Sequence, residues 1–87
     1  MRMFSKNKRT YTIYADGDAR FYIDDFVVEQ KHWRIKNSFD DKIIAYEFSS
    51  NKPHYILHKK LTKLYGHEVN IVSISKCNTF FATKKEA

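Results

Sequence analysis

The chain has few of the residues that interrupt or cross-link a fold: one cysteine, one proline and two glycines among 87 residues. Its single thiol, Cys77, cannot form an internal disulfide, and a zinc site of four cysteines is excluded by count. So little proline and glycine also excludes a linker or a low-complexity segment. The apolar runs are too short to span a membrane, and residues 1–6 do not open as a basic-then-apolar leader. We therefore expect a cytoplasmic protein with no membrane association.

The composition is that of one folded domain. Hydrophobic residues make up 43% of the chain and aromatic residues 16%, which supplies a packed interior despite a charged fraction of 30%. A chain of 87 residues is too short to divide into two domains. We predict a basic arm over residues 1–9, a single domain over 10–82 and a tail over 83–87.

The charge is basic overall and unevenly distributed. Lysine and arginine number 16 against 10 aspartates and glutamates, which gives a net charge of +6. Residues 1–15 hold four bases and no acid, residues 16–47 hold eight acids and five bases, and residues 48–87 hold seven bases and two acids. Basic ends around an acidic middle favour a polyanion or an acidic protein as partner. The alternative is that this charge serves solubility alone.

Alternating β-branched and aromatic residues predict a sheet of about five strands. Residues 10–14 and 20–23 flank Asp16-Gly17-Asp18, and Asp-Gly between two such runs indicates a tight hairpin. Further extended segments are expected at residues 26–28, 32–36, 42–48, 69–74 and 80–81.

One helix is predicted after residue 50. Ser50 and Asn51 suit a helix cap, and Pro53 suits a first turn. Three leucines then fall on one helical stripe before the stop at Gly66, namely Leu57, Leu61 and Leu64. The predicted fold is therefore α+β in the order β-β-β-β-α-β, a mostly antiparallel sheet with one helix packed on one face. The expected core consists of Tyr11, Ile13, Phe21, Ile23, Trp33, Ile35, Ile44, Tyr46, Phe48, Leu57, Leu61, Leu64 and Ile71.

If these core residues face the helix, the other face of the sheet carries aromatic rings among cations. Its side chains would be Tyr14, Arg20, Tyr22, His32, Arg34 and Lys36. Such rings stack on bases while lysine and arginine hold phosphates, as is typical of single-strand binding. Two further basic groups belong to the predicted interface: Lys6, Lys8 and Arg9 in the arm, and Lys59, Lys60 and Lys63 on the helix. Solvated sheet faces carry the same residue types for structural reasons alone.

No motif of an enzyme, a metal site or a familiar nucleic-acid module is recognised. The glycine-and-aromatic core of an RRM, the G-x-x-G loop of a KH domain and zinc-finger ligand pairs are all absent. His54 and His58 are four residues apart on the predicted helix, but no HExxH pattern accompanies them. We therefore predict no cofactor, no metal and no catalytic residue. A small metal-independent ribonuclease or toxin that uses His32 is the enzymatic alternative, because such enzymes need few groups.

Runs such as residues 11–17 and 42–48 are rich in lysine, isoleucine, tyrosine and aspartate. In this compositional style, without a diagnostic motif, the chain resembles the small early and counter-defence proteins of T-even-type bacteriophages. The resemblance implies a non-enzymatic inhibitor in the host cytoplasm, whose target is a nuclease, a toxin or a ribonucleoprotein.

Our leading hypothesis is a non-enzymatic basic protein that binds RNA or single-stranded nucleic acid. A second hypothesis is an inhibitor that covers an acidic host protein without nucleic acid. A homodimer is compatible with both hypotheses, because so small a sheet leaves strand edges exposed.

Overall fold

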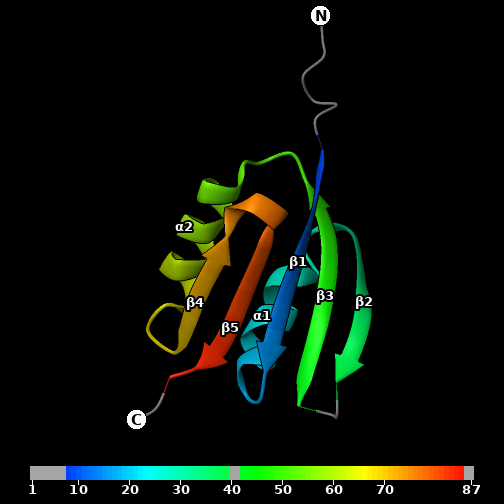
Figure 1. The fold of residues 1–87 in the computed structure, drawn as a ribbon. Coiled ribbons are helices and arrows are strands. Elements are labelled where there is room, and N and C mark those ends of the chain that lie inside the picture. The colour runs from blue at the N-terminus through cyan, green and yellow to red at the C-terminus, as the bar shows by residue number, and fades with distance from the viewer. Residues whose placement is uncertain (1–7, 40–41, 86–87) are drawn as a thin grey trace, which may run out of the picture.

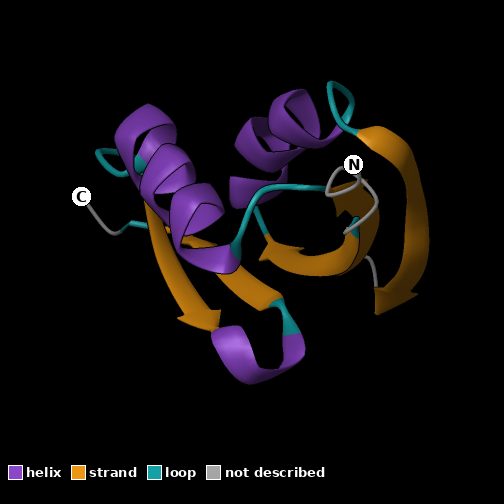
Figure 2. Cartoon of the chain, turned by 90° about the horizontal axis from the view of Figure 1, so that it is seen from above, coloured by secondary structure: helices purple, strands orange, loops and turns teal. Residues whose placement is uncertain are grey.

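The protein folds into a five-stranded mixed sheet with two helices on one of its faces (Figure 1; Figure 2). The structure is a computed structural model that describes residues 8–39 and 42–85. Its elements are β1 (Arg9–Asp16), α1 (Ala19–Val27), β2 (Lys31–Phe39), β3 (Ile43–Ser50), α2 (His54–Tyr65), β4 (Val69–Ile74), the 3₁₀ turn η2 (Ser75–Cys77) and β5 (Thr79–Lys84). The predicted α+β class and the five strands are confirmed.

The strands lie in the order β2-β3-β1-β5-β4. β1 and β5 are parallel, and the other three neighbouring pairs are antiparallel, as a mostly antiparallel sheet requires. From these pairings, β1 and β2 run the same way with β3 between them, and β3 and β4 run the same way with β1 and β5 between them. Each helix therefore joins two parallel strands of the sheet by a crossover. Both crossovers lie on the same face (Figure 2).

The prediction of strands at residues 20–23 and 26–28 is wrong, because this segment is the helix α1. Gly17 has the positive φ, +47°, that the Asp-Gly turn predicts, but the turn leads into a helix and not into a hairpin. The buried residues of α1 are Ala19, Ile23, Phe26 and Val27. Their spacing of four, three and one residues is the helical period, so this amphipathic face outweighed the local strand propensity. The predicted order with a single helix is therefore corrected to one with two helices.

The predicted helix after residue 50 is confirmed as α2. Leu57 and Leu61 are fully buried, whereas Leu64 is 53% exposed and does not belong to the core. Gly66 follows the last helical residue, and a Cβ at this position would overlap the carbonyl oxygen of Thr62. The chain therefore needs a glycine here for space, since its φ of −60° is available to any residue.

The core lies between the sheet and the two helices. Of the predicted core residues, those buried are Tyr11, Ile13, Ile23, Tyr46, Phe48, Leu57 and Leu61, while Ile44 and Ile71 are partly buried against them. Phe21, Trp33 and Ile35 were wrongly assigned to the core, since they are 64%, 40% and 53% exposed. The core residues that were not predicted are Ala15, Ala19, Phe26, Val27, Val69, Phe80 and Ala82, whereas the buried Ala45 pairs with Tyr14 on the other face of the sheet.

The described ends of the chain belong to strands. β1 begins at Arg9, inside the predicted arm, and β5 continues to Lys84, inside the predicted tail. The strand predicted at residues 69–74 is confirmed as β4, which lies at the edge of the sheet next to β5 and alternates between buried or partly buried and exposed residues. Over residues 8–39 and 42–85, neither helix is long and apolar enough to cross a membrane.

Candidate functional site

One face of the sheet has no helix over it (Figure 2), and we call it the open face. Along β1, Tyr11, Ile13 and Ala15 are buried beneath the helices, so Thr12 and Tyr14 point the opposite way. Residues paired across neighbouring strands point to the same side of a sheet. The open face is therefore formed by Thr12, Tyr14 and Asp16 of β1, Glu47 of β3, Arg34 and Lys36 of β2, Phe81 of β5, and Val72 and Ile74 of β4.

An aromatic pair occupies the centre of the open face. β1 and β5 are parallel neighbours, and their register places Tyr14 beside Phe81. The two rings stack with centroids 5.2 Å apart and planes 13° apart. Phe81 is 37% exposed, and Tyr14 is partly exposed. Rings stacked at this separation cover each other's inner faces, so their outer faces and edges are what a base can contact.

Two cations of β2 lie on the same face, two strands away from Tyr14, and share one carboxylate. Arg34 donates from Nε to Oε1 of Glu47 over 2.8 Å, and Nζ of Lys36 lies 3.9 Å from Oε2. The side chains of Arg34 and Lys36 remain 61% and 47% exposed. Three charges therefore meet at one point of the open face, with a net charge of +1, and both cations have room to contact an incoming anion.

The path of β2 is irregular where it supplies these cations. Its register against β3 shifts between Lys31 and Arg34 and again between Ile35 and Asn37. His32 lies within the first shift and has a φ of +54°, in the left-handed region that few residues other than glycine adopt. The first shift sets the register in which Arg34 pairs with Glu47 on the open face and Ile35 pairs with Tyr46 on the helix side.

An aliphatic strip borders the aromatic pair on the other side. Val72 pairs with Phe81 across the β4–β5 ladder and is 58% exposed, while Ile74 pairs with Thr79 and is 43% exposed. Because β4 is an edge strand, this strip continues to the rim of the sheet. The open face is thus charged on its β2–β3 side and apolar on its β4–β5 side.

The structure brings only part of the predicted interface together. Tyr14, Arg34 and Lys36 lie on the open face as predicted. Arg20 and Tyr22 do not, since they belong to α1 on the other side of the sheet, where the Tyr22 ring lies 6.0 Å from that of Tyr65.

The remaining predicted residues are placed elsewhere. The exposed His32 lies on the edge strand β2, and Lys8 and Arg9 are exposed at the start of β1. Lys59, Lys60 and Lys63 are exposed on α2, on the helix side of the sheet. Lys6 lies outside the described residues.

Sequence reasoning missed Phe81, the second ring of the aromatic pair. Residues 80–83 alternate between buried and exposed positions, with Phe80 and Ala82 inside. Two adjacent phenylalanines in a strand must face opposite sides of the sheet, so one of them had to be outside the core. That alternation was the available signal, but the place of β5 between β1 and β4 was not visible in the sequence.

The two helical histidines have structural surroundings. The His54 ring stacks on Phe80 with centroids 4.4 Å apart, and neither of its buried nitrogens has a hydrogen-bond partner in the described structure. Nε2 of His58 lies 3.3 Å from the carbonyl oxygen of Ile71, on the edge strand β4. Within the described residues, no three side chains of His, Cys, Asp or Glu gather closely enough to hold a metal ion.

We expect His54 to make the stability of the fold depend on pH. Burial, with a smaller contribution from the charge of His58, holds the pKa of His54 below its ordinary value of 6.5. As the pH drops through 6.5, His54 binds a proton more readily in the unfolded chain than in the folded protein. The free energy of unfolding therefore falls over this range. Urea unfolding at a series of pH values from about 5 to about 8, on both sides of the ordinary pKa, measures this slope.

The matched variant is His54→Phe, which keeps an aromatic ring against Phe80 and has no proton to bind. It should be more stable than the parent by about 1 kcal/mol at neutral pH, because it removes buried polar atoms without partners. The stability difference between variant and parent should widen as the pH falls. A constant difference across the range would show that His54 is not responsible.

A cleft on the helix side lies between α1 and the β2–β3 pair. Its lining includes Phe21, Asp24, Ile35 and Tyr46. The Tyr46 hydroxyl donates to Oδ1 of Asp24 over 3.3 Å, and burial together with that carboxylate raises the pKa of Tyr46 to about 12. The hydroxyl is therefore a donor at neutral pH, and the cleft holds a carboxylate beside an apolar wall.

Comparisons of the chain with protein-family models, with curated proteins and with solved structures found no match. The functional argument therefore depends on the residues of the open face and of the helix side themselves.

Proposed function

We propose that the protein is a non-enzymatic binder of RNA or other single-stranded nucleic acid, and that the strand lies across the open face. The observation that carries this proposal is the stacked pair of Tyr14 and Phe81, partly exposed and exposed respectively, on the neighbouring inner strands β1 and β5. Base stacking on aromatic side chains of an open sheet is a common mode of single-strand recognition. Each stacked base contributes about 1–3 kcal/mol.

The charges supply the second part of the proposal. Arg34 and Lys36 lie on the same face, on the β2 side of the aromatic pair, and are exposed enough to contact phosphates of a strand that continues from the pair toward β2. The net charge of +6 attracts a polyanion over longer distances. Each phosphate that a cation neutralises releases counterions, so affinity must fall as salt rises, with a slope of about −0.7 per contact for single strands.

The test is a titration of nuclease-treated protein against labelled single-stranded RNA, single-stranded DNA and duplex DNA at several salt concentrations. Arg34→Glu with Lys36→Glu should weaken binding to single strands and flatten the salt dependence by about 1.4, the slope of two phosphate contacts. The matched control is Lys52→Glu with Lys60→Glu, which makes the same change in charge at exposed positions away from the open face. Equal losses in the two double variants would reduce the effect to net charge and contradict the proposed surface.

Glu47→Gln should strengthen binding. The substitution releases Arg34 and Lys36 from the carboxylate they share and removes the negative charge that would face a phosphate. We expect affinity to rise up to about fivefold, because an exposed ion pair contributes about 0.2–1 kcal/mol. Glu68→Gln, in the turn before β4, is the control with the same change in charge. If both variants improve binding equally, Glu47 has no local role.

The aliphatic strip favours a second candidate function, an inhibitor that binds a protein. Val72 and Ile74 are exposed beside Phe81, and aliphatic side chains gain more from a protein partner than from nucleic acid. The compositional resemblance to phage proteins fits a host target such as a nuclease or a ribonucleoprotein. A pull-down from nuclease-treated lysate distinguishes the candidates, because a direct protein partner is retained and an RNA-bridged one is lost. Val72→Ser with Ile74→Ser should then release a directly bound partner.

A further inference from the structure

The helix side of the molecule exposes two stripes of the same pattern and opposite charge. The stripe that begins on α1 consists of Phe21, Asp25 and Glu29. The stripe on α2 consists of Tyr55, Lys59 and Lys63. In each, one aromatic residue is followed by two like charges at intervals of four residues, which places Tyr55, Lys59 and Lys63 on one side of α2 and Phe21 and Asp25 on one side of α1. Glu29 lies in the turn that follows α1, where its N–H bonds to the carbonyl oxygen of Phe26.

Both stripes face solvent, and among the described residues none of their charged side chains forms an ion pair. Phe21 is 64% exposed and Tyr55 is 68% exposed, and all four charged residues of the stripes are exposed. Among the described residues, the ion pairs formed are those of Glu47 with Arg34 and Lys36. The segment from residue 48 to 67 contains no acid at all, so α2 has a uniformly basic outer surface.

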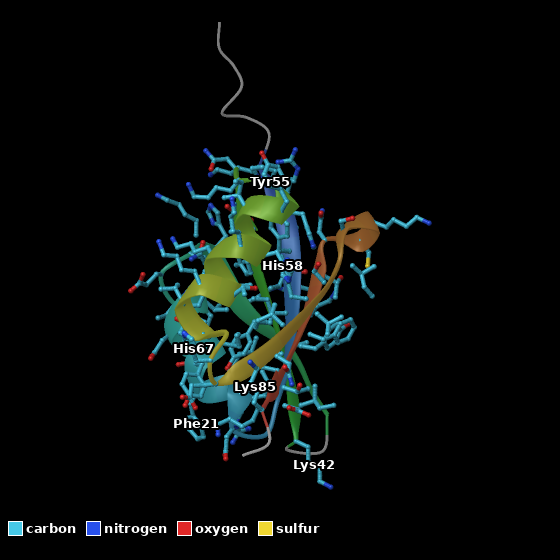
Figure 3. The ribbon with its side chains drawn as sticks, turned by 90° about the vertical axis from the view of Figure 1, so that its left-hand side faces the viewer. Phe21, Lys42, Tyr55, His58, His67 and Lys85 are labelled. Atoms are coloured by element: carbon cyan, nitrogen blue, oxygen red, sulfur yellow. The ribbon has the colours of Figure 1, made fainter. Side chains whose placement is uncertain are left out.

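The two helices run in opposite directions along the sheet. Figure 3 shows Phe21, from the first turn of α1, at the same end of the molecule as His67, which follows α2, while Tyr55 of α2 lies at the far end. Because the helices are antiparallel, the aromatic residue of each stripe lies toward the end of the other helix at which that stripe has its last charge. This arrangement determines what each stripe meets when two molecules approach through their helices.

We propose that the helix side binds a second copy of this chain, so that α1 of each copy lies against α2 of the other. A two-fold axis parallel to the helices and between them produces this contact, and it brings each stripe onto the opposite stripe of the partner. Asp25 then meets Lys59 at the middle of each helix pair. Lys63 meets the ring of Phe21, a cation–π contact, and Glu29 meets the hydroxyl of Tyr55.

The charge pattern selects this arrangement over the other two-fold arrangement. A two-fold axis across the helices would place α1 on α1 and α2 on α2, with like charges in contact, which is strongly unfavourable. Two exposed apolar side chains of the helix side, Val28 and Leu64, are 44% and 53% exposed and add apolar area to the contact. Every contact occurs twice in the dimer because of the symmetry.

The dimer would leave both open faces outward. The helices cover one side of each sheet, so joining two molecules through their helices directs the two aromatic pairs away from each other. One dimer would therefore offer two single-strand sites, which raises the apparent affinity for a long strand through effective concentration. This inference concerns a surface separate from the open face, so either can fail without the other.

The test is sedimentation equilibrium of the nuclease-treated full chain at low and high salt, with three variants. The parent should be dimeric at low salt and dissociate as salt rises. Lys59→Glu with Lys63→Glu makes both stripes acidic, and Asp25→Lys with Glu29→Lys makes both basic. Each of these variants alone should be monomeric, with a dimer Kd raised about 100-fold or more, because like charges now face each other.

An equimolar mixture of the two reversed variants should restore a dimer, because each acidic stripe then meets a basic one. The variant with all four substitutions should form a homodimer again, since it exchanges the signs of both stripes. Circular dichroism of each variant checks the fold, which these exposed side chains do not support. A monomeric parent, reversed variants that stay dimeric, or a mixture that remains monomeric would each overturn the proposal.

Discussion

Replacing both Tyr14 and Phe81 by alanine is expected to weaken binding of single-stranded RNA by at least about 30-fold. The rings stack 5.2 Å apart on the open face, and each stacked base that is lost removes about 1–3 kcal/mol. The salt dependence of the remaining binding should stay close to that of the parent, because Arg34 and Lys36 are untouched. Fluorescence anisotropy with a labelled oligonucleotide of mixed sequence measures both quantities.

Two controls separate stacking from other effects of this double variant. Phe81→Tyr keeps an aromatic ring on the open face and should bind within a few-fold of the parent. Phe21→Ala with Tyr55→Ala removes the same kind of exposed rings from the helix side, so in an assay at low protein concentration it should leave the affinity of a single site unchanged. Full binding by the alanine variant of the open face would exclude this face as the nucleic-acid site.

Replacing Phe80 by alanine is expected to lower the free energy of unfolding by about 3–5 kcal/mol. Phe80 is fully buried at the centre of the core, where its ring lies 4.4 Å from that of His54 and 6.1 Å from that of Tyr11. A loss of this size is a large fraction of the total stability of a small domain, about 5–15 kcal/mol. Urea unfolding monitored by circular dichroism gives the value.

Phe81→Ala is the matched control for this loss, because it removes the same side chain from the next residue of the same strand. With 37% of Phe81 exposed, its removal should cost much less stability than that of Phe80. The two variants should also separate function from folding, since Phe81→Ala affects RNA binding most and Phe80→Ala affects stability most. Similar unfolding free energies for the two would contradict the assigned faces of β5.

Several parts of the fold were determined by the sequence alone. The period of Leu57 and Leu61, bounded by Pro53 and Gly66, specifies α2 because these signals are local. The alternation of Tyr11 and Ile13 specifies β1 for the same reason. The open face carries Tyr14, Arg34 and Lys36 as predicted, because the period of two fixes which residues share a side once one side is buried.

Other parts were decided only by the tertiary structure. Residues 19–27 have strand-like composition, and they form α1 because a helix there buries Ile23, Phe26 and Val27 against the sheet. Trp33 and Ile35 were predicted to be buried because their strand alternates between apolar and polar residues. They are exposed, since β2 has register shifts and lies at the edge of the sheet. Both the helix α1 and the exposure of Trp33 and Ile35 depend on which other elements pack against the segment. Local propensity and periodicity do not contain that information.

The pair of Tyr14 and Phe81 depends on both the local sequence and the tertiary structure. Each strand's own alternation determines that Tyr14 and Phe81 face away from the core. That they touch depends on β5 entering the sheet between β1 and β4, parallel to β1, although 66 residues lie between Tyr14 and Phe81 along the chain. Local periodicity acts within a few residues and fixes the side of a strand. Strand order is set by which arrangement buries the most apolar area across the whole chain, so it belongs to the tertiary structure.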